Sequence, residues 1–106
     1  MGQIVKFPTP KIPPESLEVL EKRVHKLSQE SKNVFLKISH AQIRKKERKI
    51  TTRQIFDVLR SGKGIDGPKL DQFGDWRIKL KRFTAGRAVQ VVVVVKKDCL
   101  IVITVI

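Results

Sequence analysis

Residues 76–106 read WRIKLKRFTAGRAVQVVVVVKKDCLIVITVI and carry the clearest structural pattern in the chain. At the start of this stretch apolar residues alternate with basic ones: Trp76, Ile78 and Leu80 against Arg77, Lys79 and Lys81. Alternation with a period of two predicts a half-buried strand with one apolar face and one cationic face. Ala85 and Gly86 then predict a hairpin turn over residues 84–87.

The two strands expected after this turn are apolar on both faces. They cover residues 89–95 and 99–106, with a turn at residues 96–98 between them. Such strands belong in the middle of a sheet or under a helix, because a bare valine edge would invite aggregation. Within this region Trp76 is expected in the core, and Cys99 is expected as a small buried hydrophobe.

The first amphipathic segment begins at Glu15 and is expected to end near Ser31. Its apolar residues recur at spacings of three, four and three, which predicts one stripe along a helix: Leu17, Leu20, Val24 and Leu27. The natural target of this stripe is the rest of the domain, although such a helix could instead bind a partner protein.

Two further helices are expected in the middle of the chain. Residues 34–38 form a short apolar run that predicts a strand, and Ser39 could then cap a charged helix over residues 40–49. Thr51 and Gln54 fit a capping box, so a short helix is expected to start there.

The resulting fold class is α+β, with N-terminal helices packed on one face of a mostly antiparallel sheet of three to five strands. The helix after the capping box is expected to end near Gly62, and residues 61–67 are interpreted as a glycine-rich connection. Residues 1–14 contain four prolines and are expected to form an extended lead-in, followed by a single domain over residues 15–106.

The chain is strongly basic. Among 106 residues, 23 are Lys or Arg and 10 are Asp or Glu, which gives a formal net charge of +13. A positive potential of this size attracts polyanions, so nucleic acid is the leading partner class, against the alternative that the charge only keeps the surface soluble. No apolar run is long enough to span a bilayer, no secretory signal is recognised, and one cysteine cannot staple the fold. We therefore expect a cytoplasmic protein.

One group of residues has the chemistry of a phosphodiester site. If His40 begins a helix, Arg44 and Arg48 follow at four-residue steps on the same side. An imidazole exchanges protons near neutral pH, and guanidinium groups bind phosphate through paired hydrogen bonds. The alternative is a solvated basic helix with His40 at its start.

Metal and cofactor chemistry is not expected. The only His and Cys residues are His25, His40 and Cys99, and they form no cluster at ligand spacing. His25 is interpreted as a residue on the flank of its helix. Six aromatic residues, with no Tyr among them, offer little for stacking against single strands. Recognition is therefore expected to depend on phosphate contacts.

The sequence from residue 33 to residue 106 resembles a bacterial family catalogued as domain-of-unknown-function family 4258. The opening signature consists of Ser39, His40, Ala41, Arg44, Arg48, Ile50 and Thr51. The sheet half agrees in the same order, at Gly67, Pro68, Asp71, Gly74, Asp75, Trp76, Phe83, Ala85, Gly86, Ile103, Thr104 and Val105. This sequence departs from the family at Lys45 and Lys49, where the family commonly has Met and Gly.

The resemblance implies a relation to the barnase, EndoU, colicin and RelE group of small RNA-cleaving domains, many of which are toxins paired with an antitoxin. Carried over by position, it implies a catalytic set of His40, Arg44, Arg48 and Thr104. The hypothesis is a metal-independent endoribonuclease in which His40 transfers protons and Thr104 positions the phosphate or the imidazole. The expected nucleic-acid-binding residues are Lys45, Arg77, Lys79 and Lys81.

Two alternatives come from other classes of protein. The first is a non-catalytic nucleic-acid-binding module in which residues 40–49 and 52–60 mimic a helix-turn-helix. The second is a degenerate toxin-like protein that acts through a protein partner, with the leucine and valine stripe of the first helix as its contact surface.

Overall fold

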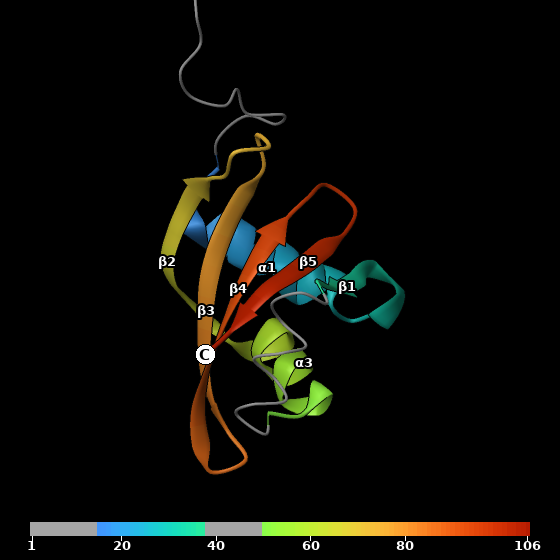
Figure 1. The fold of residues 1–106 in the computed structure, drawn as a ribbon, viewed down its shortest axis with the longest axis vertical. Helices are drawn as coiled ribbons and strands as arrows, with labels where there is room; N and C mark the ends of the chain where they lie inside the picture. Colours follow the sequence, from blue (N-terminus) through green and yellow to red (C-terminus); the bar gives the residue numbers. More distant parts are fainter. Residues whose placement is uncertain (1–14, 38–49) are drawn as a thin grey trace, which may run out of the picture.

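A single five-stranded sheet forms the centre of the computed structural model, which describes residues 15–37 and 50–106 (Figure 1). The strands are β1 (Val34–Leu36), β2 (Lys63–Leu70), β3 (Trp76–Thr84), β4 (Arg87–Val95) and β5 (Leu100–Val105). Their order across the sheet is β1-β5-β4-β3-β2, and every neighbouring pair is antiparallel except β1 and β5. The α+β class and the mostly antiparallel sheet are therefore confirmed.

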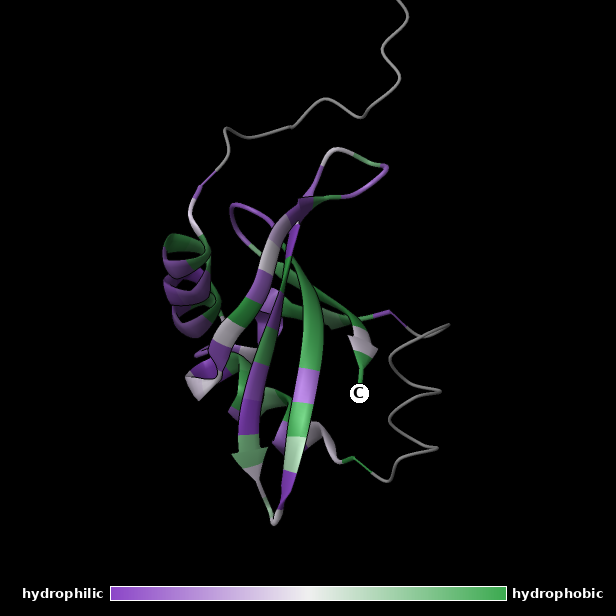
Figure 2. Ribbon diagram, turned by 90° about the vertical axis from the view of Figure 1, so that its left-hand side faces the viewer, coloured by the Kyte–Doolittle hydropathy of each residue, from purple (hydrophilic) through white to green (hydrophobic). Residues whose placement is uncertain are grey.

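Two α-helices lie on one face of this sheet. They are α1 (Leu17–Leu27) and α3 (Thr52–Ser61), and Figure 2 shows both on the same side. Since α3 lies between β1 and β2 in the chain, only α1 precedes all five strands. The helix expected over residues 40–49 lies outside the described residues.

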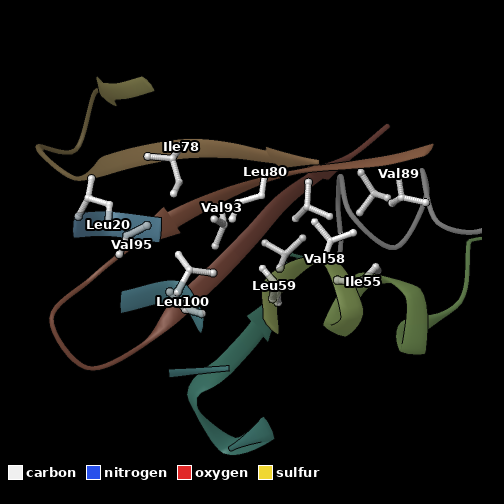
Figure 3. Packing of buried hydrophobic residues seen from close by; sticks show 14 of the residues in the cluster. Leu20, Ile55, Val58, Leu59, Ile78, Leu80, Val89, Val93, Val95 and Leu100 are labelled. Carbon is white, nitrogen blue, oxygen red and sulfur yellow. The ribbon is translucent and has the colours of Figure 1, made fainter. Parts of the chain in front are cut away.

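The valine-rich strands occupy the interior of the sheet, as predicted. Strand β4 lies between β3 and β5, and β5 lies between β4 and β1. Val91, Val93 and Val95 are at most 1 % exposed and belong to the core shown in Figure 3, between the sheet and the helices. The large apolar area buried here provides the main stabilising contribution to the fold.

The hairpin between β3 and β4 has the predicted turn. Ala85 and Gly86 both have positive φ angles, 51° and 83°, which suit a two-residue hairpin turn with the twist of its strands. Thr84 pairs with Arg87 across the turn, and from there β3 and β4 pair without interruption as far as Trp76 and Val95.

Helix α1 is fixed to the domain by its apolar stripe. Leu20 and Val24 are 0 % exposed, and Leu17 and Leu27 pack against the same core. The interpretation of this stripe as a contact surface for a partner protein is therefore wrong. The helix also ends at Leu27, whereas the sequence predicted an end near Ser31. A separate 3-10 helix follows at Ser31–Asn33.

Helix α3 begins and ends as predicted. The Gln54 N–H donates to the Thr51 hydroxyl at 3.1 Å, and the Thr51 N–H donates to the Gln54 side chain at 2.9 Å, which completes the capping box. Gly62 follows its last residue. Ile55, Val58 and Leu59 are 0 % exposed.

Strand β1 confirms the short strand that the apolar run at residues 34–38 predicts, although its bounds are narrower. Its parallel pairing with β5 aligns Val34 with Leu100 and Leu36 with Val102. This pairing was not predicted, because it joins two segments that lie far apart in the sequence.

The interpretation of residues 61–67 as a connection is wrong, because β2 begins at Lys63 and pairs with β3. Its register shifts between Gly64 and Asp66 and again between Asp66 and Lys69. Gly67 has a φ of 105°, and a Cβ atom there would lie 2.8 Å from the Arg77 carbonyl oxygen. The glycines and the proline give β2 a low strand propensity, and its pairing with the long strand β3 overrides this.

Two single-residue predictions have different outcomes. Trp76 packs against the core, as expected. Cys99 is only partly buried and precedes β5, so it is not the fully buried strand residue that the sequence predicted. In the described part of the chain, neither helix has the length and apolar character needed to cross a bilayer.

Candidate nucleic-acid interface

The sheet presents a cationic surface on the side opposite the two helices, which we call the outer face. On β3, Ile78 and Leu80 are at most 1 % exposed among the core residues. Since side chains alternate along a strand, Arg77, Lys79 and Lys81 project from the other side. We call these three residues the basic row, and the prediction of one apolar and one cationic face is confirmed.

Neighbouring strands add charge to the basic row. Across the β2–β3 ladder, Lys69 lies opposite Arg77 and Lys63 lies opposite Lys81. These two lysines were missed by sequence reasoning, because their segment was interpreted as a connection. Directly paired residues share a face, so the cationic surface is two strands wide.

The basic row has little compensating negative charge. None of the ion pairs within residues 15–37 and 50–106 includes Arg77, Lys79 or Lys81. Asp66, the acid nearest to the row in the ladder, pairs with Lys69 at 3.1 Å. The hydrogen bond and charge of Lys69, with a smaller contribution from Lys79, hold the pKa of Asp66 below its ordinary value. The positive potential of this surface therefore favours anions.

A bulge in β5 brings Thr104 to the outer face. Val93 pairs with Val102, but the adjacent Val92 pairs with Thr104, so Ile103 is an extra residue. Val102 is 0 % exposed and faces the helices. Strict alternation from Val102 would have buried Thr104 on the same side, and the extra residue reverses this.

Thr104 is thereby brought close to the basic row. Val92 pairs with Lys79 on one side and with Thr104 on the other. Because neighbouring strands lie about 4.8 Å apart, Lys79 and Thr104 are separated by about 10 Å across β4.

Two hollows on the outer face share the same residues. The smaller, of about 240 Å³, is lined in part by Lys69, Arg77, Lys79 and Thr104. The larger, of about 820 Å³, also contains Arg77 and Thr104 and extends to the loop between β2 and β3. Its volume is within the range of small-molecule sites.

The predicted site residues therefore divide into two groups. Arg77, Lys79 and Thr104 line one continuous surface, and Lys81 lies on the same face beyond the hollows. The remaining predicted residues lie outside the described part of the chain: His40, Arg44, Lys45 and Arg48.

A comparison with protein families identifies the chain. A family model, described as Domain of unknown function (DUF4258), matches residues 39–106. The chain belongs to this family. No curated protein matches the sequence. The DUF4258 region includes all four strands from β2 to β5, and hence the basic row and Thr104, whereas α1 and β1 precede it.

His25, in α1, makes a structural contact away from the outer face of the sheet. Its Nε2 lies 2.7 Å from the Gly62 carbonyl oxygen, where a ring N–H can donate. In addition, Arg60 Nε donates to the Ser28 carbonyl oxygen at 2.9 Å. Both contacts connect α1 to the end of α3. Within the described ranges, no three His, Cys, Asp or Glu side chains gather closely enough to bind a metal ion.

Polar contacts hold the β3–β4 hairpin of this DUF4258 protein against α3. Arg82 Nε lies 3.1 Å from Asp57 Oδ1, and Gln54 Nε2 donates to the Thr84 carbonyl oxygen at 3.4 Å. A hydrogen bond from the Thr84 side chain lowers the pKa of Asp57, and the hydrogen bond and charge of Arg82 add to this, while partial desolvation opposes them.

We expect the stabilising contribution of Asp57 to depend on pH. Its folded-state pKa is lowered, so the contribution is complete above the unfolded value of about 3.9 and is lost as the pH falls through the folded value. Asp57→Asn should reduce the free energy of unfolding by less than about 1 kcal/mol at neutral pH, because the ion pair is partly exposed. Urea unfolding over a pH series measures this, and a difference that stays constant into the acid range would contradict it.

Proposed function

We propose that this protein binds RNA on the outer face of its sheet. The basic row supports this, because three cations that form no ion pair with the described acidic residues project from one strand. The net charge of +13 provides the long-range attraction for a polyanion. Phosphate groups along one RNA strand would lie over Arg77, Lys79 and Lys81, with Lys63 and Lys69 beside them.

The reaction proposed at this surface is metal-independent cleavage of RNA. The RNA 2′-oxygen bonds to the adjacent phosphorus, the bond from phosphorus to the 5′-oxygen breaks, and His40 carries the 2′-hydroxyl proton to the 5′-oxygen. The products are a 2′,3′-cyclic phosphate and a 5′-hydroxyl. Thr104 would donate a hydrogen bond to a phosphoryl oxygen, and Arg44 and Arg48 would stabilise its growing charge.

The observation that carries this proposal is the bulge in β5. Without it, alternation would turn the Thr104 hydroxyl toward the apolar core; with it, Thr104 lines the same hollow as Arg77 and Lys79. A hydroxyl and two cations that line one hollow provide the hydrogen-bond donors that a phosphoryl group needs.

The biological setting proposed is that of a toxin related to the barnase and RelE group. A small α+β domain with one cationic sheet face is compatible with that group. Such a toxin would act in the cytoplasm and would be restrained by an acidic antitoxin protein that covers the basic row.

The decisive experiment is cleavage of end-labelled single-stranded RNA in excess EDTA. We expect fragments that end in 2′,3′-cyclic phosphate. We also expect Thr104→Val to cleave about 100-fold more slowly, because one donor to a developing oxyanion is lost. Valine has the same shape and favours strands, so the fold and the affinity for RNA should be retained.

The outcomes separate the classes of function. If the protein binds RNA with a strong salt dependence but never cleaves it, the protein is a non-catalytic binding module. Absence of both binding and cleavage would overturn the proposal as a whole. Equal cleavage by wild type and Thr104→Val would remove Thr104 from the mechanism.

A further inference from the structure

We infer that the outer face selects single-stranded over double-stranded RNA, by stacking unpaired bases on two exposed phenylalanines, Phe73 and Phe83. This inference rests on the proposed RNA binding. The two rings lie at opposite ends of the basic row, and they are the most exposed large apolar side chains among the described residues, at 61 % and 71 %. The small number of aromatic residues in the sequence predicts little stacking. That prediction does not take exposure into account, because composition does not tell which aromatic residues are exposed.

Phe83 continues the basic row by one step. It lies two residues after Lys81 and therefore on the same face of β3. Its partner across the β3–β4 ladder is Ala88, whose small side chain leaves the ring uncovered. Strand β2 does not extend beside Phe83, because it begins at Lys63, which pairs with Lys81.

The hairpin that carries Phe83 is held in place from the other side. Arg82, on the opposite face of β3, pairs with Asp57 of α3, and Gln54 donates to the Thr84 carbonyl oxygen. The ring is thus presented on an anchored strand, which reduces the entropy lost when a base stacks on it.

Phe73 lies at the other end of the row, in the loop between β2 and β3. The Asp71 carboxylate accepts hydrogen bonds from the N–H groups of Phe73 and Asp75, each at 2.9 Å, which fixes the loop. Phe73 lines the hollow of about 820 Å³ together with Arg77 and Thr104. A base held against this ring would lie next to the proposed cleavage site.

The order of groups along the face is therefore aromatic, three cations, aromatic. From Arg77 to Phe83 the strand spans about 20 Å, at about 3.3 Å per residue. Positive grooves with aromatic rings are the usual surface for single-stranded nucleic acid, because each unpaired base offers a π-face. In a duplex the bases are already stacked and paired, so the rings could not reach them.

The test measures the affinity of the full chain for two 2′-O-methyl RNAs, whose blocked hydroxyls prevent cleavage. One is a uridine oligonucleotide of about 12 nucleotides, within the range of known site sizes, and the other is a hairpin duplex of equal length. Fluorescence anisotropy should show tighter binding of the single strand. Phe73→Ala and Phe83→Ala should each weaken that binding by about 5-fold or more, with little change for the duplex.

Matched variants control for loss of apolar surface and for charge. Val19→Ala removes an apolar side chain that is 45 % exposed on α1, on the helix side of the sheet, and it should change the affinity for neither RNA. Phe83→Trp should retain binding, and its fluorescence should be quenched by bound RNA. Lys79→Gln should weaken the binding of both RNAs. It should also lower the slope of the logarithm of affinity against the logarithm of salt concentration by about one unit.

Each result points in one direction. If Lys79→Gln weakens binding but neither Phe→Ala variant does, stacking is overturned while RNA binding stands. Equal affinity of the wild type for both RNAs would overturn the selectivity. If no RNA binds with a salt dependence, the proposed function itself fails. Circular dichroism would verify the fold of each variant, which is expected to persist because both rings are exposed.

Discussion

His40→Ala is expected to lower the rate of RNA cleavage by about 100- to 10,000-fold, the usual contribution of a positioned proton-transfer group. The reason is that the 2′-hydroxyl is a weak nucleophile until its proton is removed, and the leaving 5′-oxygen needs a proton. We propose this role for His40 from the resemblance of the sequence around it to the family, since His40 lies outside the described residues. Single-turnover cleavage in EDTA, over a range of pH, measures the loss.

The chain offers a matched control in its other histidine. His25 lies in α1 and contacts the Gly62 carbonyl oxygen at 2.7 Å, away from the outer face. His25→Ala should therefore keep the cleavage rate and the pH profile, at some loss of stability from the missing hydrogen bond. If both substitutions reduced cleavage equally, the effect would be one of folding, and His40 would have no special role.

Leu20→Ala is expected to lower the free energy of unfolding by about 2–5 kcal/mol, the range for truncating a fully buried leucine. Leu20 is 0 % exposed and belongs to the cluster that joins α1 to the sheet. A loss of this size is a large part of the stability of a small domain. Urea unfolding followed by circular dichroism measures it.

Its neighbour Val19 provides the comparison. Val19 is 45 % exposed on the same helix, so Val19→Ala should change the unfolding free energy by only about 0.5 kcal/mol or less. If Leu20→Ala were equally mild, α1 would be an appendage rather than part of the core. In that case its stripe would again be available to a partner protein.

Much of the fold was predictable because it depends on local patterns. The alternation along β3, the turn at Ala85 and Gly86, and the capping box at Thr51 each involve residues close in sequence. The interior position of the valine strands followed from their lack of a polar face. Strand β2 and the parallel pairing of β1 depend on distant partners instead, and no local propensity indicates them.

The candidate site was predictable only in part, for a related reason. The basic row follows from alternation on one strand. The position of Thr104 depends on the bulge at Ile103, and a run of apolar residues gives no sign of which one is extra. The exposure of Phe73 and Phe83 depends on where β2 ends and on a loop fixed by Asp71, neither of which is visible in composition.

The extra residue in β5 also bears on how relatives of this chain should be aligned. Ile103 and Thr104 together oppose Val92, so a chain without residue 103 could pair regularly and still present its hydroxyl beside Lys79. Loss of a residue from an inner strand normally inverts every side chain beyond it. Here a one-residue gap at position 103 would leave the later side chains on the same sides of the sheet. Equivalent positions in the last strand should therefore be aligned by the side of the sheet they occupy rather than by residue number.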